Sequence, residues 1–184
     1  SDNLLAADVH EPRGEVHGNP VLLLHGGGQT RHAWGGAARR IADAGHMAFT
    51  LDQRGHGDSA WVEDKGYAFD DYAADAVAVS REIAEMTGRK AVLVGASLGG
   101  ISGLMAEHLG GPALLAGLVL VDITPHMDAD GVSRIQGFMA ERMREGFATL
   151  EEASDAIAAY LPNRAPRRSL HGLAKNLRLR ADGR

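Results

Sequence analysis

The chain has 184 residues, of which 45% are hydrophobic and 23% are charged, with no cysteine and a formal net charge of −5. This composition is typical of a globular protein and excludes intrinsic disorder, a disulfide scaffold, a thiol nucleophile and cysteine-ligated metal sites. No apolar run reaches the ~20 residues of a membrane helix and residues 1–12 lack a secretory signal, so we expect a cytoplasmic protein with no membrane partner.

Short apolar runs predict the strands of a sheet. None of them alternates with polar residues, which is typical of strands buried on both faces. The runs are residues 21–24, 47–51, 91–94 and 118–121, with a weaker candidate at 4–10. Helical patterns at 33–44, 70–87 and 98–109 separate them. This alternation predicts an α/β fold, a three-layer sandwich in which a mostly parallel sheet carries helices on both faces.

The pattern changes after residue 121. Residues 135–144, 151–160 and 167–177 predict three helices, and no further strand-like run follows. We therefore expect a partial α/β core at residues 1–126 and a helical, cap-like segment at residues 127–184.

The basic residues concentrate at the end of the chain. Residues 1–163 carry 12 Lys and Arg against 23 Asp and Glu, whereas residues 164–184 carry 7 against 1. Apolar residues recur there at helical spacing, namely Leu170, Leu173, Ala174 and Leu177, and no aromatic residue is present to stack on a base. We therefore predict an amphipathic helix with a solvated basic face and no nucleic-acid partner.

A Gly-Ala-Ser-Leu-Gly string occupies residues 95–99, between a predicted strand and a predicted helix. In this context Gly-x-Ser-x-Gly is typical of a nucleophile elbow, a strained turn that exposes a serine at the carboxyl end of the sheet. A Cβ at either flanking glycine would collide with the neighbouring strand and helix. We predict Ser97 as a nucleophile and the Leu98 N–H as an oxyanion-hole donor.

Three consecutive glycines follow His25 after the first predicted buried strand. Glycines leave backbone N–H groups open to approach, so we predict the Gly27 N–H as the second oxyanion donor, with Gly28 as the alternative. We interpret His25 as structural, with its ring bonding the loop backbone. A phosphate-binding loop is the competing interpretation, but neither nucleotide-binding glycine pattern accompanies it.

Residues 52–59 read Asp-Gln-Arg-Gly-His-Gly-Asp-Ser and follow the next strand. The last three of these residues resemble the nucleophile block of another class of serine esterase. Such a block belongs near the start of its domain, whereas this one follows two strands and is crowded by charges. We interpret it as a hydrogen-bonded structural loop.

These three motifs, with Trp34 nine residues after His25, together resemble the α/β-hydrolase superfamily over residues 4–126. The resemblance implies a Ser–acid–His triad, a helical cap after residue 121, and substrate contacts at Gly28 and Trp34. Haloalkane dehalogenases and epoxide hydrolases have aspartate at the position of Ser97, so the serine favours ester-type acyl transfer.

In this family the acid and the histidine usually follow the last two strands, and no strand is predicted after residue 121. Asp122 is the candidate acid, or alternatively a residue that pins the start of the cap, and His126 is the candidate base. His108 lies about 16 Å along the helix from Ser97, too far to act as the base. His171 would have to approach by closure of the cap. The chain thus resembles the first part of a hydrolase that ends within its cap and lacks the catalytic histidine.

The predicted function is a serine hydrolase acting on carboxylic esters or related small acyl compounds. The alternative is a non-catalytic binding module, or an inactive fragment, with the same fold. Neither needs a cofactor, and the nine histidines include no pair beside a carboxylate that indicates a metal site. An apolar edge left open along the last strand or the cap predicts self-association.

Overall fold

The computed structural model describes residues 3–62, 66–124, 146–160 and 170–184. The chain divides into two compact units, residues 1–124 and residues 125–184, and each is considered by itself. Within the described residues, no helix is long and apolar enough to cross a membrane.

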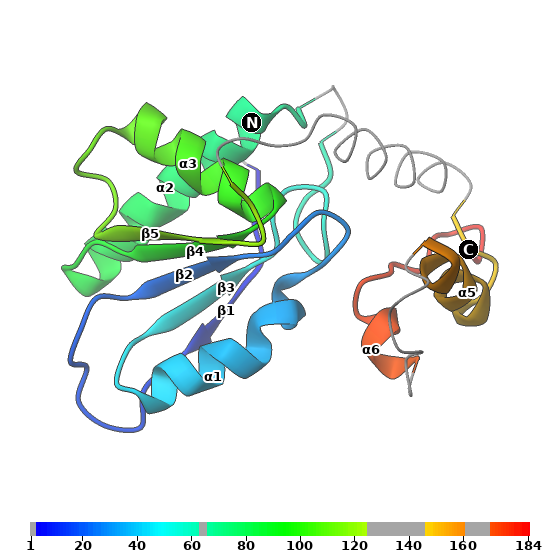
Figure 1. The fold of residues 1–184 in the computed structure, drawn as a ribbon, viewed down its shortest axis with the longest axis horizontal. Helices are drawn as coiled ribbons and strands as arrows, with labels where there is room; N and C mark the ends of the chain where they lie inside the picture. Colours follow the sequence, from blue (N-terminus) through cyan, green and yellow to red (C-terminus); the bar gives the residue numbers. More distant parts are fainter. Residues whose placement is uncertain (1–2, 63–65, 125–145, 161–169) are drawn as a thin grey trace. The chain divides into compact units, whose positions relative to one another are not determined.

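A twisted sheet forms the centre of the first unit (Figure 1). Its strands lie in the order β1-β3-β2-β4-β5. Their bounds are β1 (Ala7–His10), β2 (Val21–Leu24), β3 (Ala48–Leu51), β4 (Val92–Ala96) and β5 (Gly117–Val121). Only β1 runs antiparallel to its neighbour β3, and the other neighbouring strands are parallel. The predicted mostly parallel α/β sheet is confirmed, and it brings the carboxyl ends of β2, β3 and β4 to one edge.

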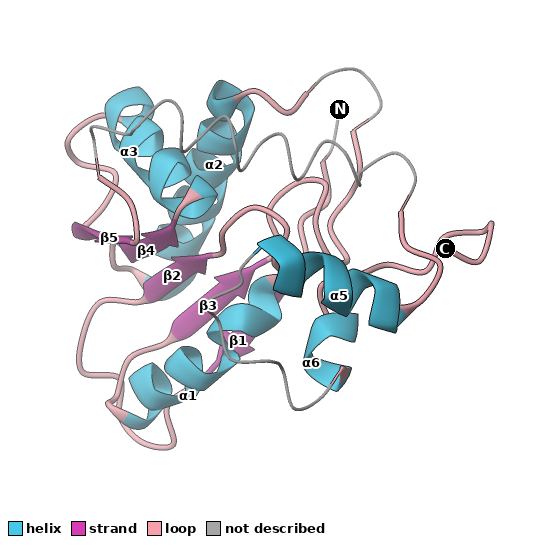
Figure 2. Cartoon of the chain, turned by 45° about the vertical axis from the view of Figure 1, so that its right-hand side comes forward, coloured by secondary structure: helices cyan, strands magenta, loops and turns pink. Residues whose placement is uncertain are grey.

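Helices cover both faces of this sheet (Figures 1 and 2). The 3₁₀ turn η1 (Arg31–Trp34) and helix α1 (Gly35–Asp43) lie on one face, and α2 (Phe69–Thr87) and α3 (Leu98–Gly110) on the other. At the start of α2, the Ala68 N–H donates to Asp71 over 2.9 Å. The first unit therefore has the three layers that the alternating pattern predicts.

The apolar core has one cluster on each face because successive strand residues point to opposite sides. The larger cluster includes Leu22, Leu24 and Leu93 and lies beneath α2 and α3. The smaller cluster, beneath α1, is built on Leu23, Ala38 and Ala48.

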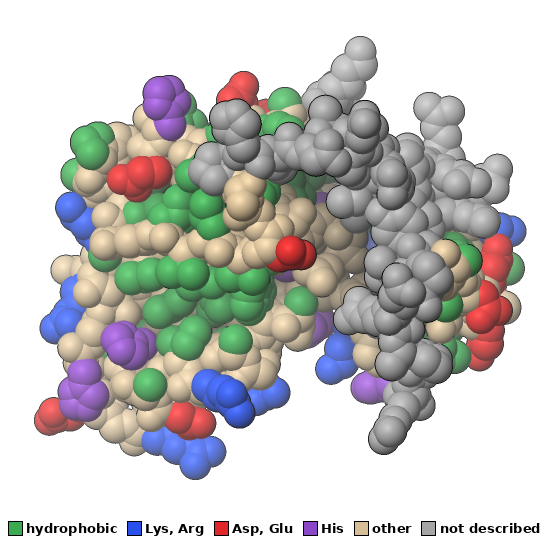
Figure 3. All heavy atoms as spheres, viewed as in Figure 1, with side chains coloured by type: hydrophobic (Ala, Val, Ile, Leu, Met, Phe, Trp, Pro, Cys, Tyr) green, Lys and Arg blue, Asp and Glu red, His purple; other side chains and the backbone are tan. Residues whose placement is uncertain are grey.

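The prediction that the apolar runs form strands buried on both faces is wrong for β4 and β5. In β4, Leu93 is fully buried, whereas Val92 and Val94 are only half-buried. Val119 of β5 is 47% exposed. Helix α1 packs on β3 and β1, and between it and β4 lies a groove of about 480 Å³. Hydrophobic side chains gather on this face in Figure 3.

The second unit contains α5 (Leu150–Tyr160) and the short α6 (His171–Ala174), which contact each other. The predicted helix at 135–144 lies outside the described residues. Helix α6 is shorter than the predicted 167–177, whose first three residues also lie outside them. The expected exposure of the apolar stripe is wrong for Leu173, which is only 2% exposed, whereas Leu177 is 37% exposed.

Candidate active site

Ser97 forms the turn between β4 and α3, with backbone angles φ 46° and ψ −111°. A positive φ is costly for any residue with a Cβ, so the surrounding structure must hold the serine in this conformation. Its N–H donates to the Val121 carbonyl of β5 over 3.2 Å. The residue is exposed, and its Oγ has no hydrogen-bond partner among the described residues. This is the strained, outward-facing serine that the motif predicts.

The two glycines that flank Ser97 allow the close packing around this turn. A Cβ on Gly95 would lie 2.3 Å from the Gly99 carbonyl oxygen, and a Cβ on Gly99 would lie 2.4 Å from the Leu24 carbonyl oxygen. Both distances are far below van der Waals contact, and both neighbours are backbone atoms that cannot rotate away. Larger residues at 95 or 99 would therefore push α3 away from β2 and β4.

The glycine loop after β2 lies beside the serine. A Cβ on Gly26 would be 3.5 Å from the Cβ of Ser97. Among the described residues, the N–H groups of Gly27 and Leu98 have no hydrogen-bond partner. Leu98 begins α3, whose first N–H groups lack intrahelical acceptors and whose N-terminus favours negative charge. The Gly28 N–H is occupied, because it donates to His56 Nε2 over 3.2 Å.

Two neutral histidines, His25 and His56, stabilise this loop. His25 is fully buried, its Nδ1 donates to the Gly26 carbonyl over 2.8 Å, and its Nε2 accepts the Gln53 N–H over 3.1 Å. Burial lowers the pKa of His25 to about 4 and also lowers the pKa of His56. The rings of His25 and His56 lie 4.9 Å apart. Both nitrogens of each ring are engaged, so neither histidine is available as a base for Ser97.

Asp52, at the end of β3, ties the far end of the loop to the sheet. Its buried carboxylate accepts the Arg31 N–H over 2.6 Å and also pairs with the Arg31 guanidinium. That guanidinium makes ion pairs with Asp8 and Asp58 as well, at 3.0 and 2.8 Å. Burial by itself would lower the pKa of Arg31, but the hydrogen bonds that its guanidinium donates to these three carboxylates outweigh burial and raise the pKa above its ordinary value.

Ser59, the alternative nucleophile of the 52–59 segment, is 1% exposed. Its Oγ donates to the Asp52 carbonyl over 2.5 Å and accepts the Ala6 N–H over 2.9 Å. Both contacts are to backbone, which fits the structural interpretation of this segment.

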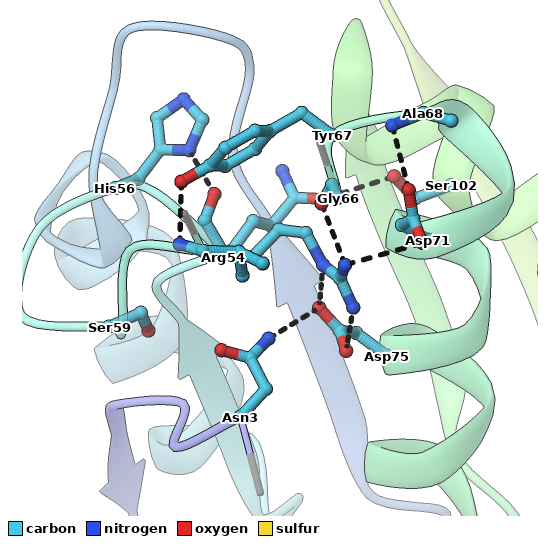
Figure 4. Close-up of polar contacts among 12 residues, drawn as sticks. Asn3, Arg54, His56, Ser59, Gly66, Tyr67, Ala68, Asp71, Asp75 and Ser102 are labelled. Carbon is cyan, nitrogen blue, oxygen red and sulfur yellow. Dashed lines mark hydrogen bonds and ion pairs between the residues drawn. The ribbon is translucent and has the colours of Figure 1, made fainter. Parts of the chain in front are cut away.

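Arg54 connects the same segment to helix α2 (Figure 4). Its guanidinium donates to both oxygens of Asp75, over 2.6 and 2.7 Å, and to the Gly66 carbonyl over 2.7 Å. Asp71 lies 3.5 Å away. The residue is only 9% exposed, so this fork holds the loop after β3 firmly against α2.

Three further residues are predicted for the site, namely Asp122, His126 and Trp34. Asp122 directly follows β5, is exposed, and has a positive φ of 54°. It makes no hydrogen bond or ion pair with another described residue. His126 lies outside the described residues. Trp34 packs against the small cluster beneath α1, with its buried Nε1 lacking a partner there.

Sequence reasoning passed over Gln53 and Ser102, two buried polar residues that hydrogen-bond to each other. The available signal was a polar side chain immediately after a buried strand and a serine within an apolar helix. Neither signal says which partner the residue meets. Within the described ranges, no group of three His, Asp or Glu side chains is arranged to hold a metal ion.

The sequence matches the alpha/beta hydrolase fold family over residues 19–167. It is 34% identical over 163 residues to the Mycobacterium tuberculosis esterase Rv0045c, covering 86% of this chain and 52% of the esterase. It is 32% identical over 126 residues to a non-heme haloperoxidase of Rhodococcus erythropolis, covering 67% of this chain and 44% of that protein.

Solved structures agree with the sequence relatives. An α/β hydrolase from Novosphingobium aromaticivorans superposes with a TM-score of 0.78 at 25% identity, covering 98% of this chain and 62% of that one. The structure of esterase Rv0045c gives a TM-score of 0.64 at 27% identity over 96% of this chain and 63% of the esterase. The chain therefore belongs to the α/β hydrolase fold family, and it spans about half the length of the curated relatives it matches.

Proposed function

We propose that this chain carries the nucleophile and oxyanion hole of a serine hydrolase for carboxylic esters or related small acyl compounds. The observation that carries the proposal is the backbone of Ser97, which is held at φ 46° between two glycines that admit no Cβ. A hydroxyl presented in this way has room to attack a bound acyl group. Kinship with esterase Rv0045c supports the ester class.

In the proposed reaction, Ser97 Oγ attacks the acyl carbonyl and a tetrahedral oxyanion forms. The N–H groups of Gly27 and Leu98 donate to this oxygen, which is the largest expected contribution of the described residues to the rate. A general base takes the Ser97 hydroxyl proton during the attack and returns it to the alcohol that collapse expels. Water then hydrolyses the acyl-serine, which releases the acid and restores the Ser97 hydroxyl. Trp34 and Gly28 are proposed to border the substrate.

The general base is a separate part of the proposal. Both candidate partners, Asp122 as the acid and His126 as the base, follow β5. We favour an acid and a histidine supplied by other parts of a longer protein, because family members supply these two residues after later strands. Residues 127–184 are proposed to be a helical cap-like segment, and residues 1–126 a partial hydrolase core.

A fluorophosphonate probe tests the nucleophile directly. We expect the full-length protein to form a covalent adduct that peptide mapping by mass spectrometry assigns to Ser97, and Ser97→Ala to abolish it. An adduct on Ser59 instead would reassign the nucleophile. A folded full-length protein that forms no adduct would refute the serine hydrolase.

A second candidate, a non-catalytic binding module, is favoured by one observation. Ser97 Oγ contacts no histidine among the described residues, and His25 and His56 are already engaged. Such a module would bind an acyl compound without turnover. Isothermal calorimetry with a non-hydrolysable ester analogue, together with an esterase assay on the same sample, separates the two candidates.

A further inference from the structure

The two proposed oxyanion donors belong to elements that are distant in the sequence. Gly27 lies in the loop after β2, and Leu98 begins α3. An oxyanion hole stabilises the transition state only when both N–H groups stay within about 0.5 Å of their working positions. The spacing between the loop and the helix therefore has to be held by something that contacts both.

One buried side chain makes both contacts. Gln53, at 3% exposure, follows β3. Its Nε2 donates to the His25 carbonyl over 2.7 Å, immediately before the glycine loop. Its Oε1 accepts a hydrogen bond from Ser102 Oγ of α3 over 3.0 Å. Ser102 is labelled in Figure 4, where a dashed line marks the hydrogen bond that its oxygen makes.

The orientation of the amide follows from its partners. The His25 carbonyl can only accept, so the nitrogen of Gln53 must face it, and the oxygen must then face α3. Only a donor satisfies that oxygen, and the Ser102 hydroxyl supplies one. Ser102 Oγ also lies 2.8 Å from the Leu98 carbonyl, one turn earlier on α3, so its hydrogen is shared between the two acceptors.

The link is distinct from the contacts that hold His25 itself. The backbone N–H of Gln53 binds the His25 ring, and this bond does not depend on the Gln53 side chain. The side-chain amide adds a hydrogen-bonded connection from the His25 carbonyl to Ser102 of α3. A residue of similar length without polar atoms would fill similar space, remove the two side-chain hydrogen bonds and keep the backbone bond to the His25 ring.

We propose that Gln53 is a positioning residue, which with Ser102 fixes the glycine loop relative to the start of α3 and so sets the spacing of the Gly27 and Leu98 amides. This inference rests on the proposed function for its catalytic meaning. The tie, which runs from the His25 carbonyl through the Gln53 amide to Ser102, is a property of the fold and is measured without turnover.

The experiment compares Gln53→Met, Ser102→Ala and the double variant in the full-length protein. Ser80→Ala is the matched control, because Ser80 is also a fully buried helical serine but its Oγ has no partner among the described residues. The first readout is backbone ¹⁵N relaxation at Gly27 and Leu98. The second readout is kcat and KM for ester hydrolysis, each determined separately, together with the rate of fluorophosphonate labelling.

We expect both single variants to increase the mobility of the Gly27 and Leu98 amides, while Ser80→Ala changes neither. We expect kcat and the labelling rate to fall by about 10- to 100-fold with KM little changed, and the double variant to be no slower than Gln53→Met. Unchanged relaxation in Gln53→Met overturns the tie whatever the activity. Additive losses, or a rise in KM alone, overturn the positioning role. If the unaltered protein neither labels nor turns over, the proposed function fails while relaxation still decides the tie.

Discussion

The backbone N–H of Gly28 donates a hydrogen bond to Nε2 of His56 over 3.2 Å, and Nδ1 of the same ring donates to the Arg54 carbonyl over 2.9 Å. A neutral imidazole satisfies both contacts, whereas a protonated one has no lone pair left for Gly28. Burial lowers the pKa of His56 and keeps the ring neutral. This contact also leaves Gly27 as the freer of the two candidate oxyanion donors in the loop.

Acid is expected to destabilise the fold through the buried histidines. The folded state lowers the pKa of His25 to about 4, mainly by burial, from about 6.5 when unfolded. Between these two pKa values the unfolded chain binds more protons than the folded one. The free energy of unfolding is therefore highest above the unfolded pKa and falls as the pH is lowered towards the folded pKa. We expect the free energy of unfolding in urea to be about 2 kcal/mol lower at pH 5 than at pH 7.

The control for this experiment is His108→Gln, which replaces a histidine at an exposed position on α3. Equal or greater stability at pH 5 would contradict a neutral, buried His25.

Gly99→Ala is expected to lower the free energy of unfolding by about 3 kcal/mol, because its Cβ would meet the Leu24 backbone at 2.4 Å. Gly36→Ala is the matched control: Gly36 is a helical glycine with open space around it, and the change should stabilise α1 by about 0.5–1 kcal/mol. Thermal unfolding of the two variants measures the contrast. A Gly99→Ala protein as stable as the parent would contradict the tight packing of α3 on β2.

Ser97→Gly is expected to be more stable than Ser97→Ala by about 1 kcal/mol, because only glycine adopts φ 46° without strain. Both substitutions remove the hydroxyl, so the difference isolates the backbone contribution. Chemical denaturation of the pair gives the value. Equal stabilities would mean that Ser97 carries no strain for the fold to hold.

Arg54→Met is expected to cost about 2–4 kcal/mol of stability, because it leaves the carboxylate of Asp75 largely buried without its guanidinium partner. The change keeps most of the side-chain length. Arg81→Met, at an exposed position on the same helix as Asp75, should alter stability by less than about 0.5 kcal/mol. If both variants unfold at the same urea concentration, the pairing of Arg54 with Asp75 does not stabilise the fold.

The 184-residue chain is expected to self-associate through the edge of its sheet. Strand β5 ends the sheet order and Val119 is 47% exposed on it. Sedimentation velocity should show oligomers that Val119→Lys reduces, whereas Leu109→Lys, at an exposed position away from the strand, leaves them unchanged. A monomer at all concentrations, or equal effects of both changes, would refute association through β5.

Local patterns predicted most of the first unit. The runs at 21–24 and 118–121 became β2 and β5, and the glycines around Ser97 predicted its strained turn, because each signal depends on neighbours a few residues away. The same local reasoning failed for the faces of β4 and β5, since a continuous apolar run does not show whether a helix covers it. It also overestimated the length of α6, which is predicted to reach residue 177 and ends at Ala174.

The sequence by itself determined the α/β fold, the family resemblance and the position of the exposed serine. Only the tertiary structure decided which polar groups support it. His56 meets Gly28 across 28 residues, and Gln53 meets Ser102 across 49. Hydrogen bonds between buried groups depend on chain segments meeting in space, and such meetings leave no periodic or local trace in the order of residues.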